Sequence, residues 1–366
     1  MTPVEFRRHL HSYPELSFEE HQTAAFIEQA LSAEGIAYRR VAKTGVLAYI
    51  DGVRQSNRAI LLRADIDALP VCEATQVDFA SKNSGVMHAC GHDMHAAVLF
   101  GALQQLNRNR DFEGRIFAIF QPGEECNPGG ASLVLNEKPF ENYDIRAVVG
   151  EHVDSSLEVG AIGVKAGKFM ASSDELRFWV RGKGGHAALR QKVCDTITAA
   201  ATLVVNLNGL NSEDLILSIG RIVGEGATNV IPDCVAMEGT MRTFDEKVRQ
   251  TTKQQIADIA HTIDERFATN TEVDINHGYP SVVNSAELCG VLQEVAADAE
   301  VAVVELERRP MAEDFGYYCE QYPSLFYRLG VGHSAGMSHT SHFMPDESAI
   351  EIGIDVMSRL ALRLMR

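Results

Sequence analysis

A short cysteine and histidine segment contains the side chains of this sequence that are best suited to metal chemistry. Cys90 and His92 are separated by one glycine within the stretch His88-Ala89-Cys90-Gly91-His92-Asp93-Met94-His95. A thiolate and an imidazole are natural ligands of a borderline divalent metal ion, and a glycine between them lets the chain turn so that both face one point. An isolated C-x-H motif is more often a buried small hydrophobe beside a surface histidine. The interpretation as a metal site therefore needs support from other segments.

Acidic and histidine side chains follow three apolar runs that have the composition of buried strands. They are Asp65 and Asp67 after 59–64, Glu124 and Glu125 after 116–120, and Glu151 and His152 after 147–149. The ligand crevice of an open α/β sheet lies outside the carboxyl ends of its strands, so these segments should converge there. A further group, His333, His339 and His342, lies in a loop rich in Gly and Ser.

The pair Glu124 and Glu125 has a spacing that suits hydrolysis. Adjacent side chains point in different directions, so one carboxylate can ligate a cation while its neighbour holds a water molecule on that cation. The alternative is a solvated acidic turn, which is what most Glu-Glu pairs are.

The segment Gly182-Lys183-Gly184-Gly185-His186-Ala187 fits the dinucleotide pattern G-x-G-x-x-G/A. We reject this interpretation, because the segment does not open a first βαβ unit and 208–211 offers no acidic group for a ribose. The glycines form either a tight turn or a loop that directs His186 at a ligand.

The order of the predicted elements indicates an α/β fold with an inserted domain. Apolar runs alternate with helical stretches over 1–171 and again over 280–366, which predicts one discontinuous α/β catalytic domain with a largely buried sheet. The order over 172–279 is β-α-β-β-α-β, the ferredoxin-like pattern of an α+β unit. Helices are predicted over 3–13, 17–35, 92–105, 193–207, 246–267, 285–297 and 312–320, and from Asp346 onward.

Composition excludes several classes of protein. The 366 residues include 50 Asp and Glu against 33 Lys and Arg, a net charge of −17 that repels nucleic acid and anionic membranes. No apolar run is long enough to span a bilayer. The 7 cysteines form no C-x-x-C pair, which argues against a disulfide framework, and the first 20 residues contain no signal-peptide core. We therefore expect a cytoplasmic protein.

Ordered motifs along nearly the whole chain make it resemble the M20 metallopeptidase and amidohydrolase superfamily. The resemblance is strongest to the aminoacylase-like branch, which includes hippurate hydrolase, auxin-conjugate hydrolases and N-acetyldiaminopimelate deacetylase. The motifs are Arg8–His11 with Pro14–Leu16, Leu62–Pro70, His88–Asp93, Gln121–Glu125, Gly184–Ala188, Asn229–Pro232, Ala312–Phe315, and His339–Phe343 followed by Asp346 and Glu347.

The resemblance implies a phosphorylase/hydrolase-like catalytic domain that binds two divalent metal ions per subunit (Zn, Mn, Co or Ni). The implied ligands are Cys90, His92, Glu125, His152 and His339. Glu124 is implied as the general base. The inserted domain is implied to form a homodimer and to lend His186 and Asn229 to the partner's active site, while Arg242 binds the substrate α-carboxylate.

We therefore expect a metal-dependent amidohydrolase that cleaves small N-acyl amino acids, for example N-acetyl amino acids, to a carboxylate and a free amino acid. A metallo-dipeptidase or carboxypeptidase would use the same dinuclear centre and remains the alternative. A cysteine nucleophile at Cys90 and a catalytically silent binding protein are the interpretations outside this class. Two departures from the family pattern stand out: Arg190-Gln191 replaces the usual Pro-His, and Cys126 follows the paired glutamates.

Overall fold

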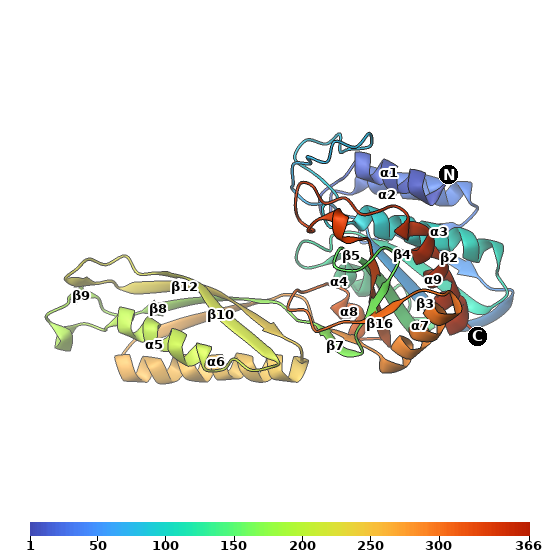
Figure 1. Cartoon of the computed structure of the whole chain (residues 1–366). Coiled ribbons are helices and arrows are strands. Elements are labelled where there is room, and N and C mark those ends of the chain that lie inside the picture. The colour runs from blue at the N-terminus through green and yellow to red at the C-terminus, as the bar shows by residue number, and fades with distance from the viewer. The chain divides into compact units, whose positions relative to one another are not determined.

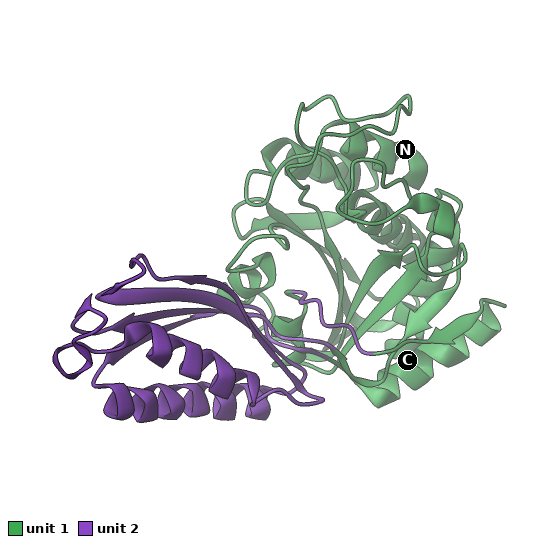
Figure 2. Cartoon of the chain, turned by 60° about the vertical axis from the view of Figure 1, so that its left-hand side comes forward, with its two compact units in different colours: residues 1–169, 283–307, 314–366 green, residues 170–282, 308–313 purple.

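The computed structural model describes residues 1–366 and divides the chain into two compact units. Unit 1 comprises Met1–Phe169, Val283–Glu307 and Asp314–Arg366, and unit 2 comprises Met170–Val282 and Arg308–Glu313 (Figure 2). The sequence places the insertion at 172–279 and does not anticipate the return of 308–313 to the smaller unit. Within unit 2, Arg308 donates from Nη1 to Asp214 Oδ1 at 2.7 Å and its guanidinium lies 5.1 Å from the centre of the Phe244 ring. These contacts explain why the segment belongs to unit 2.

Unit 1 is built on an eight-stranded mixed sheet in the order β1-β2-β4-β3-β5-β16-β6-β15. The strands are β1 (Ala37–Val41), β2 (Gly45–Asp51), β3 (Arg54–Asp65), β4 (Glu113–Gln121), β5 (Asp144–Asp154), β6 (Ile162–Val164), β15 (Val303–Glu305) and β16 (Ser324–Gly330). The central strands β4, β3, β5 and β16 run parallel to one another. Their carboxyl ends therefore meet at one edge of the sheet, as the α/β interpretation requires.

Helices cover this sheet and bury its central strands (Figure 1). They are α1 (Pro3–Ser12), α2 (His21–Ala33), α3 (His92–Arg108), α4 (Gly130–Asn136), α7 (Ala286–Asp298), α8 (Gly316–Cys319) and α9 (Ala349–Leu364). Helix α3 packs against α1 and α9, and its side chains share one core with alternate residues of the strands. Residues 59–65 of β3 are all buried, which is expected of a parallel strand covered on both faces.

Several predicted helices begin later or are shorter than the sequence suggests. Helix α2 begins at His21 and not at Ser17, because the Ser17 hydroxyl donates to Asp67 at 2.7 Å. Helix α9 begins at Ala349 and not at Asp346, whose carboxylate accepts the Ser348 backbone N–H at 2.9 Å. The predicted helix 312–320 shrinks to α8, because the Asp314 carboxylate is bound by unit 1 side chains. Strand β1 is absent from the sequence-based prediction.

Unit 2 has the predicted ferredoxin-like order. Its elements are β8 (Asp174–Arg181), α5 (Thr196–Asn208), β10 (Leu215–Val223), β12 (Cys234–Thr243), α6 (Glu246–Phe267) and β13 (Asn270–His277). The four strands form one antiparallel sheet in the order β10-β12-β8-β13. Helix α5 begins at Thr196 and not at Val193, because the Asp195 side chain caps it by accepting from Thr198 N at 3.0 Å. The predicted fold class is confirmed.

The remaining elements of the chain are short. They are the strands β7 (Gly167–Met170), β9 (Gly185–His186), β11 (Val230–Ile231) and β14 (Val282–Asn284), and the 3-10 turns Arg190–Lys192 and His333–Ala335. No helix combines the length and the apolar character that a membrane crossing needs.

Candidate metal centre

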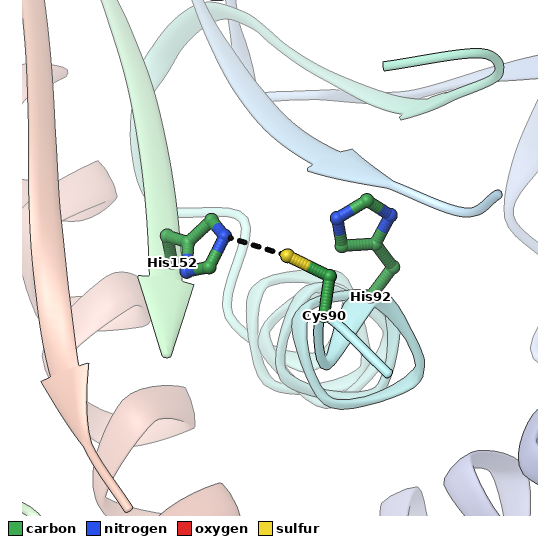
Figure 3. A group of neighbouring side chains, drawn as sticks. All are labelled: Cys90, His92 and His152. Atoms are coloured by element: carbon green, nitrogen blue, oxygen red, sulfur yellow. Dashed lines mark hydrogen bonds between the residues drawn. The ribbon is translucent and has the colours of Figure 1, made fainter. Parts of the chain in front are cut away.

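The start of α3 places Cys90 and His92 side by side (Figure 3). Gly91 between them adopts φ +88, in the left-handed region that favours glycine. A Cβ atom at this position would lie 2.5 Å from Val153 Cγ2. Both the backbone angle and the close approach of β5 therefore require glycine, and this glycine directs the thiol and the imidazole to the same point.

Five side chains from four segments of unit 1 converge at the carboxyl edge of the sheet. Cys90 Sγ lies 3.4 Å from His152 Nε2, near the end of β5 (Figure 3). The same sulfur lies 3.3 Å from His339 Nε2. Glu125 Oε1 lies 3.3 Å from His339 Nε2 and 3.9 Å from His92 Nε2. These five residues are the ligands that the resemblance implies, and the fold brings all of them together. Their role as metal ligands stays a prediction.

Hydrogen bonds to the outer ring nitrogens orient two of the histidines. His92 Nδ1 lies 2.9 Å from the backbone oxygen of Asp67, and His152 Nδ1 lies 2.7 Å from the backbone oxygen of Val153. A carbonyl oxygen only accepts, so Nδ1 donates in both rings, and in the neutral form of each ring Nε2 is the unprotonated atom. This is the usual arrangement of metal-binding histidines.

The donor atoms fit a bound cation. His92 Nε2 and Glu125 Oε1 are buried and have no hydrogen-bond partner in the protein. Burying an unpaired polar atom is costly, and a cation between these atoms would remove that cost. One sulfur, three imidazole nitrogens and one carboxylate form a mixed set suited to a borderline divalent metal such as Zn²⁺.

Burial has the largest effect on the pKa values of Cys90 and His152. Burial raises the pKa of the Cys90 thiol to about 12, so the thiol needs a neighbouring cation to ionise at neutral pH. Burial, together with the charge of Arg328, holds the pKa of His152 well below its ordinary value. The His152 ring is therefore neutral at physiological pH.

Glu124 lies beside the same cluster, on a turn that is held from both sides. Its carboxylate is buried and lies within 4.8 Å of donor atoms of His92 and Glu125. The backbone N–H of Gly123 donates to Glu20 Oε1 at 2.8 Å, and that of Glu125 donates to Asp67 Oδ2 at 3.0 Å. These bonds fix the backbone on both sides of Glu124, so its side chain has a defined direction.

The sequence did not show which residues hold the predicted ligands in place. Asp67 binds His92, Glu125 and Ser17, and Asp65 Oδ1 lies 2.5 Å from His95 Nδ1. Both aspartates follow a buried strand, so the sequence predicted that their carboxylates lie near the ligand crevice of the sheet. Nothing in the sequence showed which donors they would meet, because those donors come from other segments.

The site residues predicted for the inserted domain lie in unit 2. His186 on β9 pairs with Val230 on β11, and Ala187 N donates to the backbone oxygen of Asn229 at 2.8 Å. His186 and Asn229 are therefore neighbours on one exposed ribbon. Arg242 lies near the carboxyl end of β12, whereas the ribbon adjoins the amino end of this strand. Its side chain is half-buried, and burial lowers its pKa.

The two departures from the family pattern lie in exposed segments. Arg190 and Gln191 form an exposed 3-10 turn in unit 2, in which Arg190 lies 3.9 Å from Asp195. Cys126 is exposed immediately after Glu125.

Comparison with known proteins identifies the family. Residues 61–363 match the model of the peptidase family M20/M25/M40. The chain belongs to this family. It is 41% identical over 355 residues to an N-acetyl-L-cysteine deacetylase of Bacillus subtilis, covering 95% of this chain and 84% of that protein. This confirms the resemblance predicted from the motifs.

This M20 chain is also similar to a second curated relative and to a solved structure. An N-acyl-L-amino acid amidohydrolase of Geobacillus stearothermophilus is 41% identical over 294 residues, 78% of each chain. The crystal structure of a Bacillus subtilis protein described as a dinuclear metal binding peptidase of the M20 family superposes with a TM-score of 0.89 at 36% identity. The superposition covers 99% of this chain and 97% of the Bacillus subtilis protein.

Proposed function

We propose that this chain is a metal-dependent amidohydrolase that cleaves N-acyl amino acids, N-acetyl amino acids among them, into a carboxylate and a free amino acid. The observation that supports it most is the buried Glu124 beside five convergent donor atoms on one edge of the sheet. The names of the relatives favour acyl amino acids over the dipeptides of the alternative interpretation.

Cys90, His92, Glu125, His152 and His339 would hold two divalent metal ions per subunit, of the class Zn, Mn, Co or Ni. Such ions, when bound, polarise the acyl carbonyl and make water acidic enough to react at neutral pH. Glu124 accepts a proton from the attacking water on its carboxylate and later delivers it to the leaving amine nitrogen. One water is consumed, the C–N bond breaks, and the products are the acid and the amine.

His186 contributes a hydrogen bond to the oxygen that gains charge in the reaction. The backbone N–H of Ala188 donates to His186 Nδ1 at 3.2 Å, which places the proton of the neutral ring on Nε2. Nε2 is therefore a donor, as an oxyanion requires. Asn229 stands next to it on the ribbon and binds the same part of the substrate. The guanidinium of Arg242 forms no hydrogen bond or ion pair within the chain, so it can bind a substrate carboxylate.

We also propose a homodimer formed through unit 2, in which His186 and Asn229 serve the partner's active site. Strand β10 is an edge of the unit 2 sheet and leaves part of its backbone unpaired. The side chains of Ile216 and Ile222 on this strand are exposed, as is Val205 on α5, which is 72% exposed. A second copy of the chain would cover these apolar groups.

A cytoplasmic location is part of the same proposal. All seven cysteines are free thiols in this fold, which is the state expected in a reducing compartment.

Substitution of Glu124 tests the proposed reaction. Glu124→Gln keeps the shape of the side chain and removes the base, so kcat should fall by about 10²–10⁴ while metal content stays near wild type. Kinetics on N-acetyl-L-cysteine and on matched dipeptides, with elemental analysis of the same samples, provide the measurement. A variant that loses metal in parallel with activity would make Glu124 a ligand. Faster turnover of the dipeptides would favour the peptidase interpretation.

Mixed dimers test whether His186 acts across the dimer. Inactive His186→Ala and Glu124→Gln chains, co-expressed with different tags and purified as heterodimers, should regain activity at one of two sites if His186 serves the partner. Heterodimers that remain inactive, although each homodimer folds and binds metal, would show that His186 acts within its own chain or has no catalytic role.

A further inference from the structure

The proposed function does not explain the role of His95, a buried histidine at the end of the stretch 88–95. It also does not explain why buried charged residues surround this ring. His95 lies one turn into α3 and is 1% exposed. Its ring is 4.6 Å from that of His152 and 5.4 Å from that of His92, measured between centroids. With Asp65 and His92 it also forms a group whose geometry could hold a cation. The hydrogen bonds of His95 decide between a ligand and another role.

The proton of the His95 ring can be located from its two neighbours. The backbone N–H of Val153 donates to His95 Nε2 at 2.9 Å. A peptide nitrogen only donates, so Nε2 must be the unprotonated atom. The proton lies on Nδ1 and is donated to Asp65 Oδ1, 2.5 Å away. Both ring nitrogens are thus in use, and His95 has no lone pair left for a metal ion.

The residue whose backbone N–H donates to His95 is also the residue whose carbonyl oxygen orients His152. Strand β3 pairs with β5 only as far as Gly150, so the last residues of β5 have no β3 partner. His95 supplies an acceptor there for the N–H of Val153, while the C=O of the same residue accepts from His152 Nδ1 at 2.7 Å. The hydrogen bonds made by the N–H and the C=O of Val153 therefore link His95 to His152.

A chain of buried charges anchors Asp65 in turn. Arg63 Nη1 donates to Asp65 Oδ2 at 2.6 Å, and Arg63 Nη2 donates to Asp314 Oδ1 at 2.7 Å. Asp314 also accepts from Gln121 Nε2 and from the backbone N–H of Ala131. All three charged side chains are 0% exposed. Such an ion network is held in place because each member would be costly to leave unpaired.

We propose that His95 is a positioning residue, fixed as the Nδ1–H tautomer between Asp65 and Val153, that sets the end of β5 so that His152 presents Nε2 to the metal centre. The chain of contacts through Asp314, Arg63, Asp65, His95 and Val153 links the motifs Leu62–Pro70 and Ala312–Phe315 to His152. The inference rests on the proposed metal centre and does not depend on which acyl amino acid is cleaved.

Two isosteric substitutions separate this role from simple packing. The amide oxygen of His95→Gln can take the place of Nε2 and accept from Val153, whereas the amide of His95→Asn reaches only the position of Nδ1 and leaves the Val153 N–H unpaired. Zn²⁺ affinity, measured by competition with a chromophoric chelator, should fall about 10–100-fold in His95→Asn, the usual cost of a lost outer partner. His95→Gln should stay within a few-fold of wild type.

A matched control comes from the same motif. His88 is 1% exposed and neither of its ring nitrogens has a hydrogen-bond partner. His88→Gln and His88→Asn should therefore have equal Zn²⁺ affinities. Equal loss in both His95 variants, or no loss in either, would overturn the proposal. Because affinity is measured without substrate, a chain that binds Zn²⁺ as expected but hydrolyses no acyl amino acid would refute the proposed function alone.

The wild-type protein offers a test that needs no variant. Two-bond ¹H–¹⁵N correlation spectra of the ¹⁵N-histidine-labelled protein distinguish the tautomers of neutral rings. The His95 signals, assigned from the spectrum of His95→Gln, should show the Nδ1–H form before and after Zn²⁺ is added. An Nε2–H form, or a shift of His95 Nε2 on Zn²⁺ addition typical of a coordinated nitrogen, would make His95 a ligand and overturn the proposal.

Discussion

The buried ion cluster around His11 leads to a quantitative prediction about stability and pH. His11 Nδ1 lies 2.9 Å from Asp93 Oδ2, and His11 Nε2 lies 3.2 Å from Glu73 Oε1. Arg7 Nε donates to the same Asp93 oxygen at 3.0 Å. Burial lowers the pKa of His11, but the charge of Asp93 and the hydrogen bonds to Asp93 and Glu73 outweigh burial and raise this pKa to about 9. In the folded protein His11 is therefore a cation at neutral pH.

A raised pKa in the folded state stabilises the protein at low pH. The native chain binds the His11 proton more tightly than the unfolded chain, whose histidine has a pKa near 6.5. The stabilisation is fully present below about pH 6.5 and is lost as the pH rises through 9. Each tenfold difference in proton affinity corresponds to about 1.4 kcal/mol, so the loss between these two values is about 3 kcal/mol.

Comparison of wild type with His11→Asn isolates this contribution. Asparagine retains a donor for Asp93 but does not titrate, so the difference in unfolding free energy between the two proteins should shrink by about 3 kcal/mol from pH 6 to pH 10. Urea titrations followed by far-UV circular dichroism measure it. The one tryptophan, Trp179, lies on β8 of unit 2, and its fluorescence reports that unit separately.

An exposed histidine provides the control for this measurement. The side chain of His21 is 67% exposed, and His21→Asn should change stability by less than about 0.5 kcal/mol at every pH. A wild-type to His11→Asn difference that stays constant from pH 6 to pH 10 would refute the reasoning, because it would mean that His11 is not a buried cation.

Two further predictions concern the centre and its substrate. Cys90→Ala and His152→Ala should each bind less than half the wild-type amount of metal by elemental analysis, because each removes a donor from a shared site; full occupancy in both would mean that the ligands are wrongly assigned. Arg242→Ala should raise KM by about 10–100-fold for substrates with a free α-carboxylate, the usual worth of a charged hydrogen bond. The same variant should leave the KM of the corresponding carboxamides unchanged, and an equal rise for both would remove the carboxylate role.

The metal-binding motifs were recognisable from the sequence because they are local. Cys90 and His92 lie two residues apart, and Gly91 between them has a backbone angle that only a glycine adopts easily. The pair Glu124 and Glu125 likewise depends on adjacent residues. Their position at strand ends followed from hydrophobic patterning, because buried parallel strands are continuous apolar runs.

Helix boundaries were less predictable, because side chains from distant segments compete for the capping positions. Ser17 and Asp314 each have local signals for helix formation, yet the first binds Asp67 and the second binds Arg63 across 251 residues. Local propensity is worth less than a buried hydrogen bond to a charged group, so the tertiary contact decides where the helix begins.

The amino-acid sequence by itself determined the fold class, the ferredoxin-like insertion and, through its motifs, the family and the five expected ligands. Only the tertiary structure decided which ring nitrogen each histidine of the centre presents. A tautomer depends on the partner at the far side of the ring. The partners of His92 and His95, the backbone oxygen of Asp67 and the carboxylate of Asp65, become neighbours of these rings only when α3 packs against β3. His152 meets the backbone oxygen of the next residue, Val153, in the conformation that β5 adopts. Hydrogen bonds act over about 3 Å, a distance that spacing along the chain does not specify.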